Sequence, residues 1–295
     1  MSSRSSTDHV RELLRPDSED LRTRVLRARD RTSAQNHLRA GLPEDLLLMD
    51  FVDFEEVHPG YAPVLCGAWR GSRLEGLVSL RPSILLDSRL QPEALTALLP
   101  YIERLSGGLV KSCWTPVSVL WDHLSAIGRR SLIDRRETLY LARPEIRQTV
   151  AAPPGVRVRP AEARDLEALV VAASASLREE GRPDPFPGDP VGFRAWVKSR
   201  LPRARVVDRG GAVVFVAYAD VRRSEGWLIQ GVYTMPENRR SGFAAIGMSA
   251  ILDEAFSAGT DHVQLAVVDG NDAGLGLYNS LGFEATSELR TILFG

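Results

Sequence analysis

The segment PENRRSGFAA, residues 236–245, places two arginines, a serine and a glycine between an apolar strand-like run and a long helix-like run. The first backbone N–H groups of a helix lack helical partners and carry partial positive charge, so a helix start can bind phosphate. Gly242 would let a ligand approach the backbone, while Arg239 and Arg240 offer forked donors that match phosphate oxygens. Ser241 adds a hydroxyl donor. The segment predicts a phosphate-binding helix start; taken alone, an exposed turn with a left-handed glycine is the plainer alternative.

The residues around the segment favour the phosphate interpretation. The pattern R-x-x-G-x-A at 239–244 follows a strand-like run that ends in VYTMPE. Further along come Asn271 and then Tyr278, which begins the pattern Y-x-x-x-G-F. These three elements, in this order, resemble those of the GNAT superfamily of acetyl-CoA-dependent N-acetyltransferases. The resemblance covers roughly residues 156–294.

The resemblance implies a binding site for acetyl-CoA as co-substrate, with no metal. It implies that the pyrophosphate lies on the N–H groups of residues 240–245 and the pantetheine arm along residues 232–234, where strands of the family splay apart. Asn271 is expected to contact the arm, and Tyr278 to stand beside the thioester sulfur and protonate the departing thiolate. The implied cofactor-binding residues are Val232, Tyr233, Thr234, Arg239, Arg240, Ser241, Gly242, Phe243, Ala244, Ala245 and Asn271.

The chemistry of acyl transfer is compatible with these roles. The reaction needs an unprotonated amine, a stabilised oxyanion and a leaving thiol. A tyrosine is a suitable acid for a thiolate because their unperturbed pKa values differ by about two units. Without the resemblance, Tyr278 would be interpreted as a packing aromatic and Asn271 as a helix N-cap, and Asn271 can serve both purposes.

The general base is the least defined part of the predicted site. Many relatives use a carboxylate on the strand before the segment called here the arginine hinge, residues 236–245. On that strand this chain has Gln230, and Glu225 lies near the start of the strand. Glu179 and Glu180 lie in the region that usually covers the acceptor, where they could attract an amine or take its proton. A solvated pair at a helix end is the alternative. The predicted catalytic residues are Tyr278, Glu225 and Glu180.

The segment REEGRPDPFPGDPVGFRAW, residues 178–196, is expected to line the acceptor entrance. Its carboxylates suit an amine, and its aromatic side chains could contact the acceptor or anchor the loop. These residues are Glu179, Glu180, Asp184, Asp189, Phe186, Phe193 and Trp196. They do not separate a protein lysine, a protein N-terminus or a small amine.

Hydrophobic periodicity predicts the elements that position these residues. Pro153, Pro154 and Gly155 interrupt the pattern and divide the chain into residues 1–150 and 151–295. The second half is predicted to follow the order β-α-α-β-β-β-α-β-α-β. Its predicted elements are a strand at 156–160, helices at 163–177 and 191–201, strands at 204–208, 212–221 and 226–235, a helix at 244–258, a strand at 262–268, a helix at 273–281 and a strand at 283–294.

The first half repeats part of this order more faintly, without sequence repetition. Its predicted elements are a hairpin at 64–80, a helix at 95–105, a strand at 109–114, a helix at 117–127 and a strand at 136–142. The mixed-charge run at 11–31 is interpreted as a solvated helical face. No counterpart of the arginine hinge occurs; residues 81–94 read RPSILLDSRLQPEA. The fold class implied is α/β (α+β), with tandem GNAT-like domains, the first degenerate, each a mixed, largely antiparallel sheet flanked by helices.

Composition limits the other possibilities. The chain has 295 residues, 44% of them hydrophobic, and a formal net charge of −1, so nothing global favours nucleic acid or an anionic membrane. The two cysteines, Cys66 and Cys113, and the five dispersed histidines predict neither disulfides nor a metal site. Without a long apolar run or a signal-peptide core, a cytoplasmic protein is expected. Its oligomeric state is left open.

Two alternatives to an N-acetyltransferase remain at this stage. A protein with the same fold could bind acyl-CoA as a sensor or inactive interaction module, and the lack of an obvious base favours that alternative. A Rossmann-type nucleotide enzyme is disfavoured because the chain has no G-x-G-x-x-G at a first strand-to-helix turn.

Overall fold

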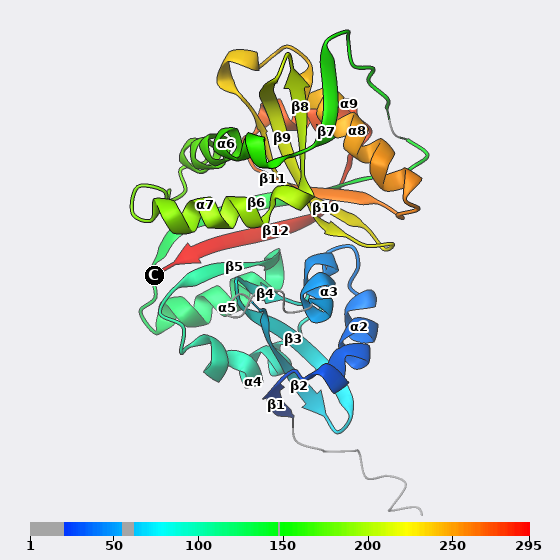
Figure 1. Cartoon of the computed structure of the whole chain (residues 1–295). Coiled ribbons are helices and arrows are strands. Elements are labelled where there is room, and N and C mark those ends of the chain that lie inside the picture. The colour runs from blue at the N-terminus through cyan, green and yellow to red at the C-terminus, as the bar shows by residue number, and fades with distance from the viewer. Residues whose placement is uncertain (1–20, 55–61, 147) are drawn as a thin grey trace, which may run out of the picture.

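One order of elements, β-α-α-β-β-β-α-β-α-β, occurs twice in the computed structural model, which describes residues 21–54, 62–146 and 148–295 (Figure 1). The first copy consists of β1 (Arg22–Val25), α2 (Arg31–Arg39), α3 (Leu46–Asp53), β2 (Val64–Arg70), β3 (Arg73–Arg81), β4 (Ile84–Leu86), α4 (Pro92–Ile102), β5 (Gly108–Cys113), α5 (Trp114–Ala126) and β6 (Ser131–Ala142). The second consists of β7 (Val156–Pro160), α6 (Leu166–Glu179), α7 (Pro190–Ser199), β8 (Ala204–Arg209), β9 (Ala212–Arg222), β10 (Trp227–Thr234), α8 (Phe243–Ser257), β11 (Val263–Val268), α9 (Asp272–Ser280) and β12 (Glu284–Phe294). The order predicted for the second half is confirmed.

All the described strands form one 12-stranded sheet, in the order β1-β2-β3-β4-β5-β12-β6-β11-β10-β9-β8-β7. Two sets, β1–β5 and β7–β11, mirror each other across the central pair β12 and β6. Among the described strands only β4–β5 and β10–β11 pair in parallel. The mixed, largely antiparallel sheet with flanking helices, which the sequence predicted, is confirmed.

The central pair is made by an exchange of last strands. β6 pairs with β11 of the second half, and β12 pairs with β5 of the first half, beside which it lies in red in Figure 1. Ile292 and Phe294 of β12 are buried in the core of the first half, while Ala142 of β6 is buried in the core of the second. Each half therefore completes its core with a strand from the other.

A repeated ion pair marks the start of both copies. Arg24 donates from Nη2 to Asp30 at 2.9 Å, and Arg159 donates from Nη2 to Asp165 at 2.9 Å, each from an edge strand into a short 3₁₀ turn. Both turns read Ala-Arg-Asp, and the arginine hydrogen bonds lower the pKa of both aspartates. The prediction of a solvated helical face here was wrong for residues 22–30, because this part of the mixed-charge run forms β1 and the turn before α2. Residues 11–20 of that run lie outside the described residues.

The strands of the second half present two different faces. Side chains of β9 alternate, so Phe215 and Ala217 pack in the core under α8, while Val216 and Tyr218 pack in the core under α6 and α7. Figure 1 shows α8 and the α6–α7 pair on different sides of this sheet. The end of β10 is therefore reached by α8 from one side and by α6 from the other.

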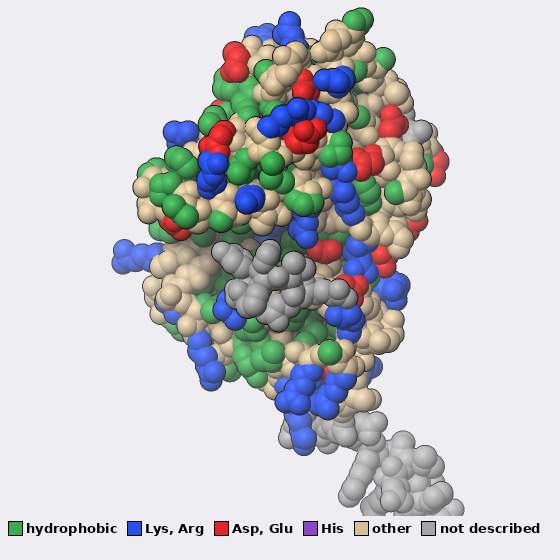
Figure 2. Space-filling model, in the orientation of Figure 1, with side chains coloured by type: hydrophobic (Ala, Val, Ile, Leu, Met, Phe, Trp, Pro, Cys, Tyr) green, Lys and Arg blue, Asp and Glu red, His purple; other side chains and the backbone are tan. Residues whose placement is uncertain are grey.

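Charged side chains of both signs are interspersed on the face of the molecule shown in Figure 2, in keeping with a net charge of −1. Within the described part of the chain, no helix has the length and apolar character needed to cross a membrane. In the same residues, no group of three or more histidine, cysteine or acidic side chains is arranged to hold a metal ion.

Candidate active site

β10 and β11 separate soon after they begin. Their ladder contains only Trp227↔Val263 and Leu228↔Gln264, although β10 continues to Thr234. On its other edge β10 stays paired with β9, with an irregularity between Gln230 and Tyr233. The strand thus leaves one edge free beyond Leu228, in the stretch that contains the predicted pantetheine residues 232–234.

The bulge in β10 is built around Gly231. Its φ of 58° lies in the left-handed region, and a Cβ there would stand 2.9 Å from the ring of Tyr218. Only glycine satisfies both constraints without strain. Bulges redirect backbone and side chains locally, so β10 changes direction within its free stretch, just before residues 232–234.

The start of α8 is open and uncapped. Gly242 is its N-cap, with φ 79°, no side-chain cap and no acidic residue in the first turn. A Cβ on Gly242 would meet no atom within 4 Å, and residues 239–242 are exposed. Among the described residues, Arg240 is the one non-glycine residue with a positive φ, 62°. A strained backbone beside free helical N–H groups fits a diphosphate site, because such strain concentrates where a ligand is bound.

Arg239 lies on the α6 side of this loop. Its Nη2 donates to both carboxylate oxygens of Glu179 at 2.8 Å, and its Nε donates to the carbonyl of Thr234 at 3.2 Å. The hydroxyl of Tyr233 also donates to Glu179, at 2.8 Å. Burial would raise the pKa of Glu179, but the bonds from Arg239 and Tyr233 outweigh it and lower that pKa. In this structure the predicted phosphate ligand Arg239 is engaged by a carboxylate.

Tyr278 is part of the core as well as the site. It is 7% exposed, and its ring packs edge-on against Phe283 with the centroids 5.7 Å apart. Its hydroxyl has no hydrogen-bond partner among the described residues. Burial, together with the nearby charge of Glu180, raises the pKa of Tyr278 to about 12. The hydroxyl therefore keeps its proton at neutral pH, as an acid for a departing thiolate requires.

Asn271 caps α9. Its side chain accepts a hydrogen bond from the backbone N–H of Gly274 at 3.0 Å, and the residue is exposed. The N-cap interpretation is therefore seen directly. Contact with a pantetheine arm stays a prediction.

The two predicted catalytic glutamates lie in different places. Glu180 follows α6, 3.6 Å from Arg135 of β6, and its charge reaches Tyr278. Glu225 lies in the turn before β10, where Arg223 donates to it at 3.3 Å. That turn is at the opposite end of β10 from the bulge. The structure brings Glu180 near Tyr278 and places Glu225 away from it.

Two carboxylates of the predicted acidic entrance serve the loop itself. Asp184 accepts hydrogen bonds from Ser174 Oγ at 2.5 Å and from the N–H of Phe186 at 3.0 Å. Asp189 is the N-cap of α7 and accepts from the N–H of Gly192 at 2.8 Å. These two aspartates therefore help to shape the loop, while Glu179 and Glu180 are paired with Arg239 and Arg135.

A cluster of side chains beside the bulge was not identified from the sequence. The guanidinium of Arg200, at the end of α7, lies 3.9 Å from the ring centroid of Tyr218 and 4.9 Å from that of Trp196. Its Nε donates to Asp220 at 3.2 Å. The Tyr218 hydroxyl is buried without a hydrogen-bond partner among the described residues. The alternation of side chains along β9 could have identified this cluster, because it places residues 218 and 220 on the face toward α7.

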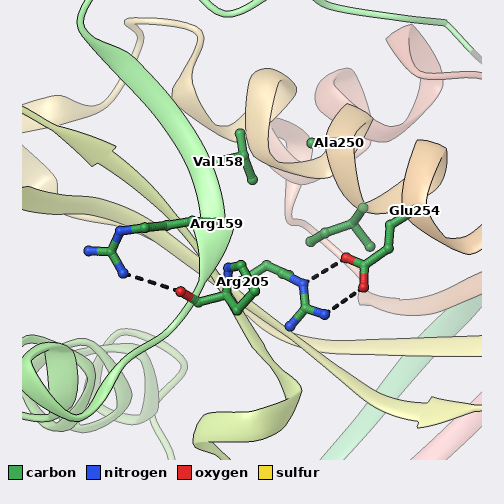
Figure 3. Close-up of a pocket in the computed structure, with 7 residues that line it drawn as sticks. Val158, Arg159, Arg205, Ala250 and Glu254 are labelled. Carbon is green, nitrogen blue, oxygen red and sulfur yellow. Dashed lines mark hydrogen bonds and ion pairs between the residues drawn. The ribbon is translucent and has the colours of Figure 1, made fainter.

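A hollow of about 230 Å³ lies elsewhere, between β7, β8 and α8. Figure 3 shows that Arg205 forms a forked pair with Glu254 across it, with Nε–Oε2 at 2.7 Å. None of the predicted cofactor residues lines this hollow. Because its charged groups neutralise each other, it offers no evident ligand site.

Residues 171–283 match the model of the acetyltransferase (GNAT) family. Two curated relatives, from Pseudomonas paraeruginosa and Pseudomonas aeruginosa, are named L-methionine sulfoximine/L-methionine sulfone acetyltransferase. Each is 27% identical over 111 residues, which is 35% of this chain and 64% of the relative. The matched part of the chain thus spans less than two thirds of these relatives.

Solved structures resemble the whole described chain. A Drosophila protein has a TM-score of 0.71 at 13% identity and covers 93% of this chain and 99% of its own. A tandem GNAT protein from the clavulanic acid biosynthesis pathway has a TM-score of 0.59 at 14% identity, covering 93% of this chain and 98% of its own. These likenesses concern the fold, and they extend over both halves.

Proposed function

Residues 171–283 match the acetyltransferase (GNAT) family, and on that premise we propose that this chain is a GNAT enzyme that transfers an acetyl group from acetyl-CoA to a primary amine. The second half, residues 151–295, is proposed as the catalytic domain, and residues 1–150 as a degenerate copy. A cytoplasmic location stays a prediction.

One observation carries the proposal: the open start of α8 directly follows the free edge of β10. A diphosphate on the N–H groups of residues 240–245 would leave the pantetheine arm to run back along residues 232–234. Those backbone groups can hold the arm as an additional strand would. The thioester would then lie near the bulge at Gly231.

The residues present can support direct attack by the amine on the thioester within a ternary complex. Backbone N–H groups at the bulge can stabilise the oxyanion that forms on the thioester carbonyl. The Tyr278 hydroxyl, which stays protonated, can donate to the departing sulfur. The charge of Glu180 reaches Tyr278, and Glu180 belongs to the segment expected to line the acceptor entrance.

The acceptor is proposed to be an amine of a protein or small molecule. The curated relatives are named for L-methionine sulfoximine and L-methionine sulfone, which are small amino acids. Carboxylates at the end of α6 suit the ammonium group that all these acceptors share. Methionine sulfone and lysine peptides therefore both belong in the test panel.

A second candidate function is an acyl-CoA-binding sensor or inactive interaction module. Gln230, on β10 immediately before the bulge, cannot take a proton, and Glu225 lies at the far end of the same strand. A site without a base would bind the thioester and leave it intact.

The test is to incubate the full chain with acetyl-CoA and the amine panel, and to follow release of free thiol. Turnover on an amine that is lost in Tyr278→Phe, while coenzyme A still binds, supports the transferase. Binding of acetyl-CoA without turnover on any amine supports the sensor. Absence of coenzyme A binding refutes both.

A further inference from the structure

The contact between Glu179 and Arg239 joins the two sides of the site. Glu179 is the last residue of α6, whereas Arg239 belongs to the loop before α8. One carboxylate oxygen of Glu179 accepts from Tyr233 and from Arg239, and the other accepts from Arg239, all at 2.8 Å. The acceptor side is thereby tied to the diphosphate loop through a single carboxylate.

This contact competes with the proposed ligand. Arg239 is one of two arginines beside the open helix start, and a guanidinium that holds a carboxylate has fewer donors for phosphate. Both partners are well exposed, with 41% of the Arg239 side chain and 47% of the Glu179 side chain accessible. An exposed pair is screened and weak. A diphosphate carries more charge and is also held by the helical N–H groups, so it should displace Glu179 from Arg239.

We propose that Arg239 releases Glu179 when the diphosphate binds, and that the released carboxylate then holds the ammonium group of the acceptor. This inference rests on the proposed function, because it requires coenzyme A at the start of α8. It adds a coupling between the two substrates: cofactor binding uncovers the acceptor site.

The surroundings of Glu179 suit this second role. The hydroxyl of Tyr233 still holds the carboxylate after Arg239 leaves, at the end of β10 where the arm would lie. The core under α6 contains Tyr233, so the carboxylate lies on the face of the sheet opposite α8. It therefore lies on the same face of the sheet as Tyr218, the cross-strand partner of Gln230.

The first experiment measures binding of coenzyme A to the full chain by calorimetry. Glu179→Gln keeps an acceptor for Tyr233 but removes the charge that engages Arg239, so affinity should rise by about threefold or more. The matched control is Glu167→Gln, on the same helix, which loses an exposed pair with Arg194 and should leave affinity unchanged. Unchanged or weaker binding in Glu179→Gln overturns the proposal.

A double-variant cycle tests the route of the effect. With Arg239→Gln already present, Glu179→Gln should no longer raise the affinity for coenzyme A. An equal gain in both backgrounds would contradict release by Arg239. Thermal melts of the four proteins check that each is folded.

Steady-state kinetics test the acceptor half of the proposal. Glu179→Gln should raise KM for the cationic amine by about fivefold or more and change kcat less. An unchanged KM refutes this role. Absence of coenzyme A binding in the unchanged chain would refute the proposed function itself. Normal binding of coenzyme A without an effect of Glu179→Gln would refute only the release of Glu179.

Discussion

The two halves place a helix start at the end of an equivalent strand, and neither start has a side-chain cap, but the two differ in what they offer an anion. In the second half, residues 235–242 lead to an uncapped α8. In the first, residues 87–91 connect β4 to α4, whose first residue is Pro92. Pro116 is the third residue of the neighbouring α5. Because proline has no N–H, the hollow of about 200 Å³ at this place has fewer donors for an anion.

The loop in the first half is also fixed by buried carboxylates. Asp45 accepts from the N–H of Ser88 at 2.7 Å and from its hydroxyl at 3.1 Å. Asp87 accepts from the N–H of Leu77 at 2.7 Å and lies 3.2 Å from His37. In the second half the loop before α8 is held instead by the exposed contact of Arg239 with Glu179 at the end of α6. The same loop is thus fixed by two buried carboxyl groups in one half, whereas in the other it presents two exposed arginines.

Two predicted site residues of the second half also differ from the residues at the matching positions of the first. Counted from their helix starts, Tyr278 and the N-cap Asn271 of α9 correspond to Leu120 and Cys113 of α5. Leu120 is fully buried in the first core, and Cys113 makes no side-chain cap. The comparison predicts that changes in the second half alter binding or turnover, while matched changes in the first half do not.

The largest expected effect is that of Tyr278→Phe. It removes the proposed acid but keeps the ring against Phe283, so kcat should fall by about 100-fold. Coenzyme A affinity should persist. The matched variant Leu120→Met should change kcat by less than about twofold. Equal kcat in Tyr278→Phe and the unchanged chain would exclude Tyr278 as the acid.

The second largest effect is expected from Gly242→Asp. Aspartate tolerates a positive φ better than most residues, and the space beyond Gly242 is open, so the chain should fold. Its charge would stand at the diphosphate position and weaken coenzyme A binding by about 2 kcal/mol, roughly 30-fold. Calorimetry measures this. Gln91→Asp, at the N-cap of α4, should have no effect; a similar loss there would erase the distinction between the halves.

Asp45, in the first half, is expected to make the stability of the protein depend on pH. Burial, and then the charge of Asp87, raises the pKa of Asp45 from its ordinary value of 3.8 to about 8. The folded state then binds more protons than the unfolded state between these values, so stability falls as pH rises from about 4 to about 8.

Asp45→Asn mimics the protonated form and should flatten this dependence. At pH 8.5 the variant should be more stable by about 1 kcal/mol or more, and at pH 4 the two proteins should be similar. Urea unfolding at both pH values is the measurement. Parallel pH profiles for the two proteins would mean that Asp45 does not titrate in this range.

The smallest effect is expected from Asn271→Ala. Loss of the bond from Gly274 should cost about 1 kcal/mol of unfolding free energy. If Asn271 also contacts the pantetheine arm, coenzyme A affinity falls beyond what the stability change explains. Unfolding curves and calorimetry on one preparation separate the two roles.

The sequence predicted the local elements around this candidate site. The arginine–glycine hinge, the helix after it and Tyr278 are read from contiguous residues, and the order of elements in the second half follows from periodicity. The first half was harder because β1 is hidden in a mixed-charge run and β4, Ile84–Leu86, is very short.

Contacts between distant residues were not predictable in this way. The exchange of β6 and β12 depends on which strand edges meet, and no local pattern encodes that. The engagement of Arg239 by Glu179 joins residues 60 apart. For the same reason Arg200 and Tyr218 became visible as a cluster only in three dimensions. The division at residue 150 stays a proposal, since each half contains a strand of the other.

The most direct test of the central claim is a crystal structure of the full chain grown with coenzyme A. We expect a single coenzyme A per chain, with its diphosphate on the N–H groups of residues 240–245 and its arm along residues 232–234. An empty α8 start, or coenzyme A bound at the start of α4 instead, would contradict the account.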